Sequence, residues 1–527
     1  MEYPTSRRWI AALLIGAAAA RMAVYFYGAA PAEDAWITLR YSRNIANGLG
    51  FVYNPGEAVL GTTTPLWTLL NALYIRLFGA ATVVAFAFWL SMLLDLATIV
   101  LISAVLTRAG FKPITSWGAV LPLAFFSPFV FSTVSGMETS LFCAILAFSL
   151  YSFRSDNRIL AFASAGLLAL CRPEGYLWLG FLLLTVTLER RELPWREAGA
   201  SVAVAAPWLV FSAWRFGTII PHSAIAKSPF TYSSLARGLK SGLELIPKSF
   251  LALTFLGYLP HVGLLNGVWP RRALELLAAC MFLLGAMVGV RRRGTREMVL
   301  FFFVLILFYP LAAPDILCSW YGVPPSVLFY PILMLGLWRV CGFAVKRFPR
   351  PLKRRPDAPW VLACGALLLV LVPGLAIRAY HLELYSKNEA DTRKAIGLFF
   401  AQQTPAEATV MLEPIGYIGY FSGRYVYDLA GLVSPAITKL RQESPSGWCA
   451  KAIFSFSPDY IVLRDYEIPQ NYVFVGGGRF FSTSQERADF FSRYTEVRKY
   501  AGDSVDGNQW ESYVVFQKRS RPQSVQP

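Results

Sequence analysis

Apolar runs of membrane-spanning length recur along the chain from Trp9 to Ile377, and short polar clusters separate them. A helix needs about 20 apolar residues to cross the roughly 30 Å hydrocarbon core of a bilayer. The composition agrees, because 55% of the residues are hydrophobic, only 15% are charged and the mean hydropathy is +0.46. We therefore predict an α-helical multi-pass membrane protein with about 10–13 helical membrane segments.

The net charge of +17 raises the alternative of a nucleic-acid-binding protein. The basic residues, however, stand in short clusters between apolar runs, such as Arg7-Arg8, Arg190-Arg191 and Arg291–Arg293, and not along one amphipathic face. Clusters of this kind mark cytoplasmic loops under the positive-inside rule. We expect no nucleic acid as a partner, membrane lipids around the helices, and a cytoplasmic N-terminus.

The first apolar run is interpreted as an uncleaved helix that leads out of the cytoplasm. Residues 31–64 then form a long outer loop. The next segment, Pro65 to Phe78, is short and carries Arg76, so we expect it in the outer interface and not across the bilayer.

The segment from Ile159 to Leu188 has basic residues beyond both ends and the sequence Arg172-Pro-Glu-Gly175 in its middle. This pattern predicts a helical hairpin with a tip that cannot fully leave the bilayer. Irregular polar backbone at that depth is tolerated only where it lines protein or a wet cavity. We therefore expect Arg172 and Glu174 to face an internal cleft that opens to the outer side.

The pattern changes after Arg378. Amphipathic helix and short strands alternate with Gly, Pro and Ser turns, which predicts a small C-terminal α/β domain. We divide the chain into a polytopic domain (1–380), an extracytoplasmic α/β domain (381–520) and a loose tail (521–527). A helix is expected over 391–402, and the expected strands are 408–412, 460–463 and 513–516.

Two adjacent carboxylates, Glu33 and Asp34, stand directly outside the first membrane helix. Acidic residues at a helix N-terminus interact well with the helix dipole, so a solvated helix start explains them as readily as chemistry does. If 32–46 is helical, Glu33 shares a face with Arg40, and Asp34 lies on the neighbouring face. A carboxylate beside an arginine suits a general base next to an anion site.

Several other residues in or near apolar runs are also candidates for a structural or a functional role. Glu138 either begins the next helix as a cap or faces a cleft, and Asp95 is a functional candidate or the partner of a basic residue. Arg21 is expected to extend outward to the membrane surface. Asp315 and Tyr321 lie on a late outer loop, where they are either solvated or in contact with the acceptor. The seven cysteines are interpreted as small buried hydrophobes.

A series of motifs then resembles one known family. The resemblance begins at Glu33-Asp-Ala-Trp-Ile-Thr-Leu-Arg-Tyr41 and continues, in order, through six further stretches. These are 47–57, 61–67, 135–142, Arg172-Pro-Glu-Gly175, Phe216 to Lys227, and Gly416 to Ser434. Together they resemble bacterial GT-C glycosyltransferases, and within these the terminal arabinofuranosyltransferase-like family of mycobacterial cell walls.

The resemblance implies an enzyme of the bacterial cytoplasmic membrane. It would transfer a sugar, such as a pentofuranose like arabinofuranose, from a polyprenyl-phosphate donor to a cell-envelope glycan or lipid acceptor, with inversion at the anomeric carbon. The C-terminal domain would be periplasmic. A polytopic transporter or lipid flippase is the alternative that many membrane segments alone would allow.

The resemblance also assigns roles to particular residues. It maps the catalytic base onto Asp34, with Glu33 as the other candidate. The residues implied to bind the donor phosphate are Arg40, Arg43, Arg172 and Lys227. The further cleft candidates are Glu138, Glu174 and His222, and His222 stands where relatives have asparagine. Some GT-C enzymes use a divalent metal held by loop acids, and the sequence leaves both the metal and its ligands open.

Overall fold

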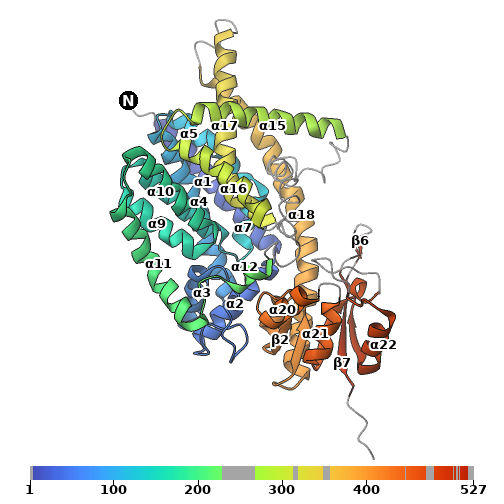
Figure 1. The fold of residues 1–527 in the computed structure, drawn as a ribbon. Helices are drawn as coiled ribbons and strands as arrows, with labels where there is room; N and C mark the ends of the chain where they lie inside the picture. Colours follow the sequence, from blue (N-terminus) through green and yellow to red (C-terminus); the bar gives the residue numbers. More distant parts are fainter. Residues whose placement is uncertain are drawn as a thin grey trace, which may run out of the picture.

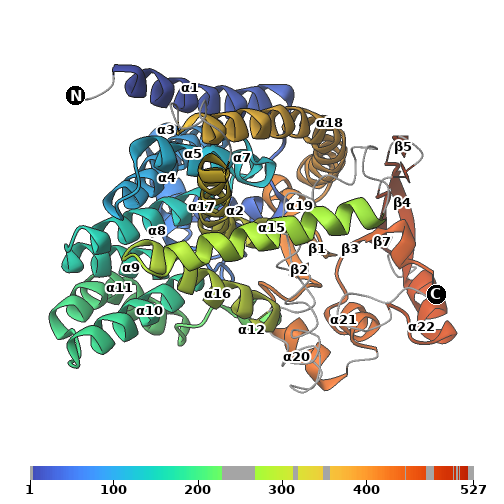
Figure 2. The same cartoon turned by 90° about the horizontal axis from the view of Figure 1, so that it is seen from above.

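The computed structural model describes residues 4–227, 268–312, 319–347, 356–444, 447–469, 480–502, 504–505, 508–509 and 511–519. Asp315 and the predicted tail lie outside these residues. Figure 1 shows a body of long helices with a smaller domain of strands and short helices attached at one end. Seen from above in Figure 2, the strands gather on one side of the helical body.

Apolar helices form the body, and all of them except α11 contribute side chains to one large core. Their bounds are α1 Pro4–Tyr27, α4 Val83–Arg108, α5 Pro113–Ala119, α6 Leu121–Phe125, α7 Ser127–Val134, α8 Thr139–Arg154, α9 Arg158–Cys171, α10 Glu174–Arg190, α11 Trp195–Phe216, α15 Val268–Gly289, α16 Thr295–Ala312 and α17 Val323–Arg347. A short 3-10 helix, η3 Ser319–Gly322, leads into α17.

Four helical stretches in the described part of the chain are long and apolar enough to cross a bilayer. They are Arg8–Tyr27, Val83–Arg108, Trp320–Val345 and Ala358–Tyr380. The bent pair Pro113–Phe125 and Ser127–Val134 makes a fifth if it is one broken span, and shorter apolar helices accompany them. The prediction of a multi-pass helical membrane protein is confirmed, whereas the expected number of about 10–13 segments stays a prediction.

Arg21 does not extend to the membrane surface, so that expectation is wrong. Its side chain is fully buried, and its Nε lies 2.9 Å from Oδ2 of Asp95. The guanidinium also donates to the carbonyl oxygens of Leu123 and Ala124, next to the break between α6 and α7, and Thr133 donates to the same Asp95 oxygen. The carbonyls freed by the broken helix and the Asp95 charge together retain the arginine inside.

The predicted outer loop folds onto one end of the body. It contains α2 Glu33–Ala46 and is followed by α3 Pro65–Phe78, and α12 His222–Lys227 lies at the same end (Figure 1). The 14 residues of α3 are fewer than a perpendicular span needs, which is consistent with a position in the interface. The predicted hairpin is confirmed, because α9 and α10 run on either side of Arg172 and Pro173.

One continuous helix, α18 Ala358–Gln403, connects the body to the C-terminal domain. Its 46 residues are about 69 Å long at 1.5 Å per residue. The domain boundary predicted at residue 380 therefore falls inside a helix, because the apolar pattern ends there while the hydrogen-bonded helix continues.

A five-stranded sheet in the order β2-β1-β3-β7-β4 forms the centre of the C-terminal domain, which confirms the α/β prediction. The strands are β1 Thr409–Leu412, β2 Tyr425–Asp428, β3 Tyr460–Arg464, β4 Tyr494–Tyr500 and β7 Tyr513–Lys518, with a small pair β5 Ser504–Val505 and β6 Asn508–Gln509. β1 is parallel to β2 and β3, and β7 is antiparallel to β3 and β4. The short helices are α19 Tyr417–Ser422, α20 Pro435–Glu443, α21 Trp448–Phe456, η5 Asp465–Glu467 and α22 Ser484–Arg493.

The outer loop and the C-terminal domain share one hydrophobic core. Tyr41 and Tyr53 of the loop pack with Val410 of β1 and Ile418 of α19 in this core. Gly419 permits the close approach, because a Cβ at that position would lie 2.0 Å from the Tyr53 hydroxyl. The structure therefore joins two segments that the sequence separates by more than 300 residues.

Candidate active site

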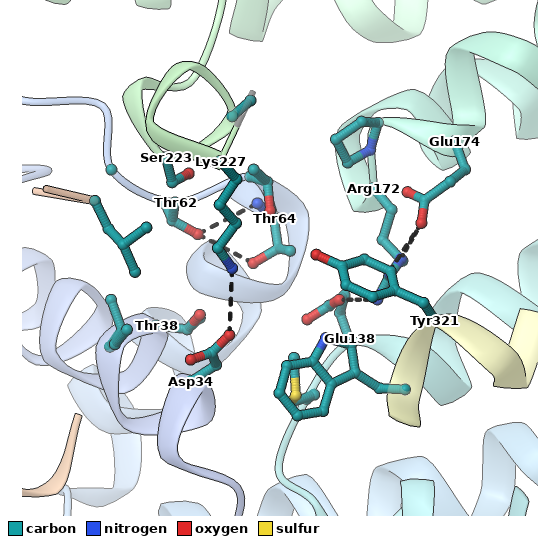
Figure 3. Close-up of a pocket in the computed structure, with 18 of the residues that line it drawn as sticks. Asp34, Thr38, Thr62, Thr64, Glu138, Arg172, Glu174, Ser223, Lys227 and Tyr321 are labelled. Carbon is teal, nitrogen blue, oxygen red and sulfur yellow. Dashed lines mark hydrogen bonds and ion pairs between the residues drawn. The ribbon is translucent and has the colours of Figure 1, made fainter. Parts of the chain in front are cut away.

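A cavity of about 290 Å³ lies where the outer loop, the tip of the hairpin, α12, the C-terminal part of α16 and η3 meet (Figure 3). Its walls combine carboxylates, two cationic groups, hydroxyls and aromatic rings. The lining residues are Asp34, Ile37, Thr38, Gly61, Thr62, Thr63, Thr64, Met137, Glu138, Arg172, Pro173, Glu174, Ser223, Ala224, Lys227, Phe308, Tyr309, Trp320, Tyr321 and Leu432.

Asp34 and Lys227 face each other on one side of the cavity (Figure 3). The Lys227 Nζ lies 3.6 Å from Oδ2 of Asp34, and the two side chains are 22% and 29% exposed. Asp34 is in the first turn of α2, and Lys227 ends α12. The pair therefore offers the cavity a carboxylate and an ammonium group that solvent or a ligand can reach.

Hydroxyl groups surround this pair. Thr62 Oγ1 lies 3.1 Å from Thr64 Oγ1 and accepts a hydrogen bond from the Thr64 backbone N–H. The Ser223 side chain is buried, and among the described residues its Oγ has no hydrogen-bond partner. A buried hydroxyl in the wall of a cavity without a protein partner is a group that a ligand could bind.

Arg172 occupies the opposite wall and binds two carboxylates. Its Nη1 lies 2.6 Å from Oε1 of Glu138, and its Nε and Nη2 both donate to Oε1 of Glu174. The three side chains are almost completely buried. Gly175 makes this tight tip possible, because a Cβ there would lie 2.1 Å from the backbone of Leu168 in α9.

Aromatic rings close the cavity beside Arg172. The guanidinium carbon lies 5.5 Å from the centre of the Tyr321 ring, which also packs 5.3 Å from the Tyr309 ring. Trp320 completes this wall. Tyr321 was named from the sequence, and Ser223 and the threonines at 62–64 lie in motif stretches to which no role was assigned. Tyr309 and Trp320 were not named, because no spacing rule connects late apolar helices to the first loop.

Glu33 points away from the cavity. Its Oε2 lies 3.2 Å from Nη1 of Arg393 on α18, and its Oε1 accepts a hydrogen bond from the backbone N–H of Gly416. Burial raises the pKa of the Glu33 carboxyl, while Arg393 and the Gly416 N–H act in the opposite direction. The structure therefore separates the two adjacent carboxylates, one in the cavity and one at the interface with the C-terminal domain.

Arg40, Arg43 and His222 do not line this cavity. The buried Arg40 guanidinium donates to the carbonyl oxygens of Tyr53, Gly419 and Arg424 and stacks on the Tyr53 ring, so it connects the loop to the C-terminal domain. These partners occupy the guanidinium and leave it no access to the cavity.

The other two residues also contact the C-terminal domain. The Arg43 guanidinium stacks on the Tyr420 ring at 4.2 Å. His222 Nε2 lies 3.0 Å from Thr438 Oγ1, and burial lowers the pKa of its imidazole.

The acids of the cavity do not form a recognisable metal site. Among the described residues, no group of three or more His, Cys, Asp or Glu side chains is close enough to hold an ion. Asp34 is paired with Lys227, and Glu138 and Glu174 are paired with Arg172. A divalent cation bound at these three acids would have to displace their cationic partners, so the acids of the described part of the cavity do not by themselves fit one.

Comparison with solved structures identifies the fold. ArnT from Cupriavidus metallidurans, solved with bound undecaprenyl phosphate, is 12% identical over 98% of this chain and 99% of its own, with a TM-score of 0.53. The archaeal oligosaccharyltransferase AglB from Archaeoglobus fulgidus, solved with an inhibitory peptide and a dolichol-phosphate, is 12% identical over 100% of this chain and 75% of its own, with a TM-score of 0.56. Both are GT-C glycosyltransferases, and the chain has the GT-C fold that its motifs predicted.

Two comparisons of sequence add to this. The terminal β-(1→2)-arabinofuranosyltransferase of Mycobacterium tuberculosis is 30% identical over an alignment of 222 residues that covers 37% of this chain and 34% of that enzyme. The match thus spans about a third of the curated relative's length. Residues 378–511 match the model of a domain of unknown function, DUF8728. That range contains the second half of α18 and most of the C-terminal sheet.

Proposed function

We propose that this protein is a membrane glycosyltransferase of the bacterial cytoplasmic membrane. It transfers a sugar from a polyprenyl-phosphate donor to a cell-envelope glycan or lipid on the extracytoplasmic side, with the N-terminus cytoplasmic and the C-terminal domain outside. The observation that carries the proposal is the cavity in which the Asp34 carboxylate and the Lys227 ammonium lie 3.6 Å apart. The GT-C fold and the undecaprenyl phosphate bound to ArnT support it.

Glycosyl transfer requires a general base for the acceptor hydroxyl and, close to it, a cationic group that binds the donor phosphate. Asp34 accepts the proton of the acceptor hydroxyl, and the acceptor oxygen forms a bond to the anomeric carbon of the donor sugar. The bond between that carbon and the phosphate oxygen breaks, and its electron pair stays on the polyprenyl phosphate. Direct attack from the opposite face inverts the anomeric configuration.

Lys227 is the best candidate to bind the donor phosphate. Its ammonium can stabilise the charge that develops on the leaving phosphate, and Ser223 and Thr62 can donate hydroxyl hydrogens to phosphate oxygens. Arg172 is less suited to this task, because Glu138 and Glu174 already neutralise its charge.

The mycobacterial relative suggests a pentofuranose such as arabinofuranose as the sugar. The sequence match behind this suggestion covers about a third of that relative. The C-terminal domain would guide the acceptor, because it contributes Leu432 to the rim of the cavity.

The test uses purified full-length protein in detergent and a panel of polyprenyl-phosphate sugars with a glycan acceptor. Released polyprenyl phosphate is measured by mass spectrometry. Wild type should release it from at least one donor, and Asp34→Asn should reduce the rate by about 10²–10⁴-fold, the usual contribution of a general base. Asp391→Asn, on the exposed side of α18, is the matched control.

Two outcomes would contradict the proposal. Full activity of Asp34→Asn would exclude Asp34 as the base. Counterflow of a lipid-linked sugar across liposomes without any release of polyprenyl phosphate would favour the transporter or flippase alternative.

A further inference from the structure

We infer that the wall of the cavity opposite Lys227, formed by Glu138, Arg172, Glu174 and Tyr321, is the subsite for the transferred sugar, and that it selects sugars without negative charge. The inference rests on the proposed function and deepens it, because it assigns a substrate class to a part of the site that the base and the phosphate do not use.

The charge of this wall is the first argument. Two carboxylates, Glu138 and Glu174, surround one guanidinium, so the cluster keeps one formal negative charge. All three side chains are about 4% exposed or less, and charge interactions are strong where water is excluded. An anionic sugar next to this cluster would be repelled, whereas a neutral sugar would not.

The hydrogen-bonding capacity of the carboxylates is the second argument. An ionised carboxylate can accept about four hydrogen bonds and donates none. Arg172 uses only Oε1 of Glu138 and only Oε1 of Glu174. Both acids line the cavity, so acceptor sites remain for the hydroxyl groups of a sugar. Hydroxyl donors to a carboxylate form the stronger class of charge-assisted hydrogen bonds.

The ring of Tyr321 provides the third argument. It is held between the Arg172 guanidinium, 5.5 Å from its centre, and the Tyr309 ring, 5.3 Å away. Figure 3 shows the ring beside Arg172 and across the cavity from Lys227. A fixed aromatic ring next to carboxylate acceptors suits a sugar, which presents apolar C–H faces and polar edges. The phosphate would then lie at Lys227 and the sugar would lie against Tyr321.

The experiment compares polyprenyl-phosphate donors that carry a neutral pentose, a neutral hexose or the matching hexuronic acid. For wild type, kcat/KM should be about a hundredfold lower for the hexuronic acid than for the neutral hexose, because its carboxylate would lie next to the excess negative charge of Glu138 and Glu174. Glu138→Gln removes one negative charge and should reduce this preference about tenfold or more.

A second variant tests the sugar subsite independently, in case Glu138→Gln does not fold. Tyr321→Leu should raise KM about tenfold for neutral donors through lost stacking. Polyprenyl phosphate without a sugar should inhibit wild type and Tyr321→Leu equally, because its phosphate site is intact. Tyr176→Leu, at a ring that is 45% exposed on α10, is the matched control and should behave as wild type.

Different results would contradict the sugar subsite and the proposed function. Equal use of the hexuronic acid and hexose donors by wild type would overturn the sugar subsite and leave the transferase intact. Unchanged KM in Tyr321→Leu would do the same. Release from none of the donors by folded wild type would overturn the proposed function, and the subsite with it.

Discussion

Glu33 and Arg393 are 360 residues apart in sequence, and their side chains lie 3.2 Å apart at the junction of the outer loop and the C-terminal domain. Arg393 also binds Glu389 and Glu511, and its Nε donates to the Tyr513 hydroxyl. Glu33 immediately precedes the proposed base in α2. The C-terminal domain therefore fixes the helix turn that carries Asp34.

This arrangement predicts different defects for the two adjacent acids. Glu33→Gln loses the charge that pairs with Arg393, but its side-chain carbonyl oxygen can still accept a hydrogen bond from Arg393, so activity should fall about tenfold or less. Asp34→Asn should lose about 10²–10⁴-fold in kcat while its thermal stability stays near that of wild type. Initial rates and unfolding temperatures of both variants, measured together, check this. An equal loss of kcat in both variants would contradict the assignment of Asp34, and not Glu33, as the general base.

Arg393 should be required for stability. The side chain is 8% exposed and pairs with Glu33, Glu389 and Glu511, which are 21%, 15% and 27% exposed, so Arg393→Met removes a cation that these carboxylates share. Removal of one partner from a fully buried pair costs about 3–5 kcal/mol, and the partial exposure of these carboxylates should make the loss smaller. We expect a lower unfolding temperature and faster proteolysis within the C-terminal domain. Lys394→Met, one residue further on the exposed side of α18, should change the unfolding temperature little.

His222 should make the contact between α12 and the C-terminal domain sensitive to acid. Burial lowers the pKa of His222 in the folded state, so below the ordinary value of about 6.5 the unfolded chain binds the extra proton more readily. Stability should therefore fall as pH decreases through this range. His222→Asn retains a side chain that can bond Thr438 and removes the titration. The unfolding temperature of wild type relative to this variant should drop between pH 7 and pH 5, and a constant difference would contradict the prediction.

Asp428 should have the opposite pH dependence. Its carboxylate accepts hydrogen bonds from the backbone N–H groups of Ala430 and Val433, yet burial raises its pKa to about 7. The folded state then binds a proton that the unfolded chain releases above about pH 4, so stability falls as pH rises from about 4 to 7. The unfolding temperature relative to Asp428→Asn should decrease over that range. A change confined to pH values below 4 would exclude the raised pKa.

Local patterns in the sequence predicted much of the architecture. The apolar runs, the hairpin around Arg172-Pro-Glu-Gly175 and the three predicted strands, which correspond to β1, β3 and β7, are confirmed, because the length and period of hydrophobicity depend only on neighbours in the chain. The strands β2 and β4 were not predicted. The domain boundary predicted at residue 380 falls inside α18 for the same reason. Its hydropathy changes near residue 380, but the backbone hydrogen bonds continue to Gln403.

The partners of charged residues could not be predicted from local sequence patterns. The sequence places Arg21 near a membrane end and Arg40 on the helix of the acids, where a surface position and a phosphate site were reasonable expectations. Asp95 and the carbonyls at the break between α6 and α7 retain Arg21 in the interior. Carbonyls of the C-terminal domain bind Arg40.

The sequence by itself determined that this protein crosses the membrane, that a polar loop with two acids precedes most of the apolar helices, and that an α/β domain follows them. Only the tertiary structure decided which acid faces the cavity, that Lys227 lies beside it and that Arg172 is already neutralised. The physical reason is that hydrophobic periodicity is a local property, whereas a charged group is placed by partners that folding brings from distant parts of the chain.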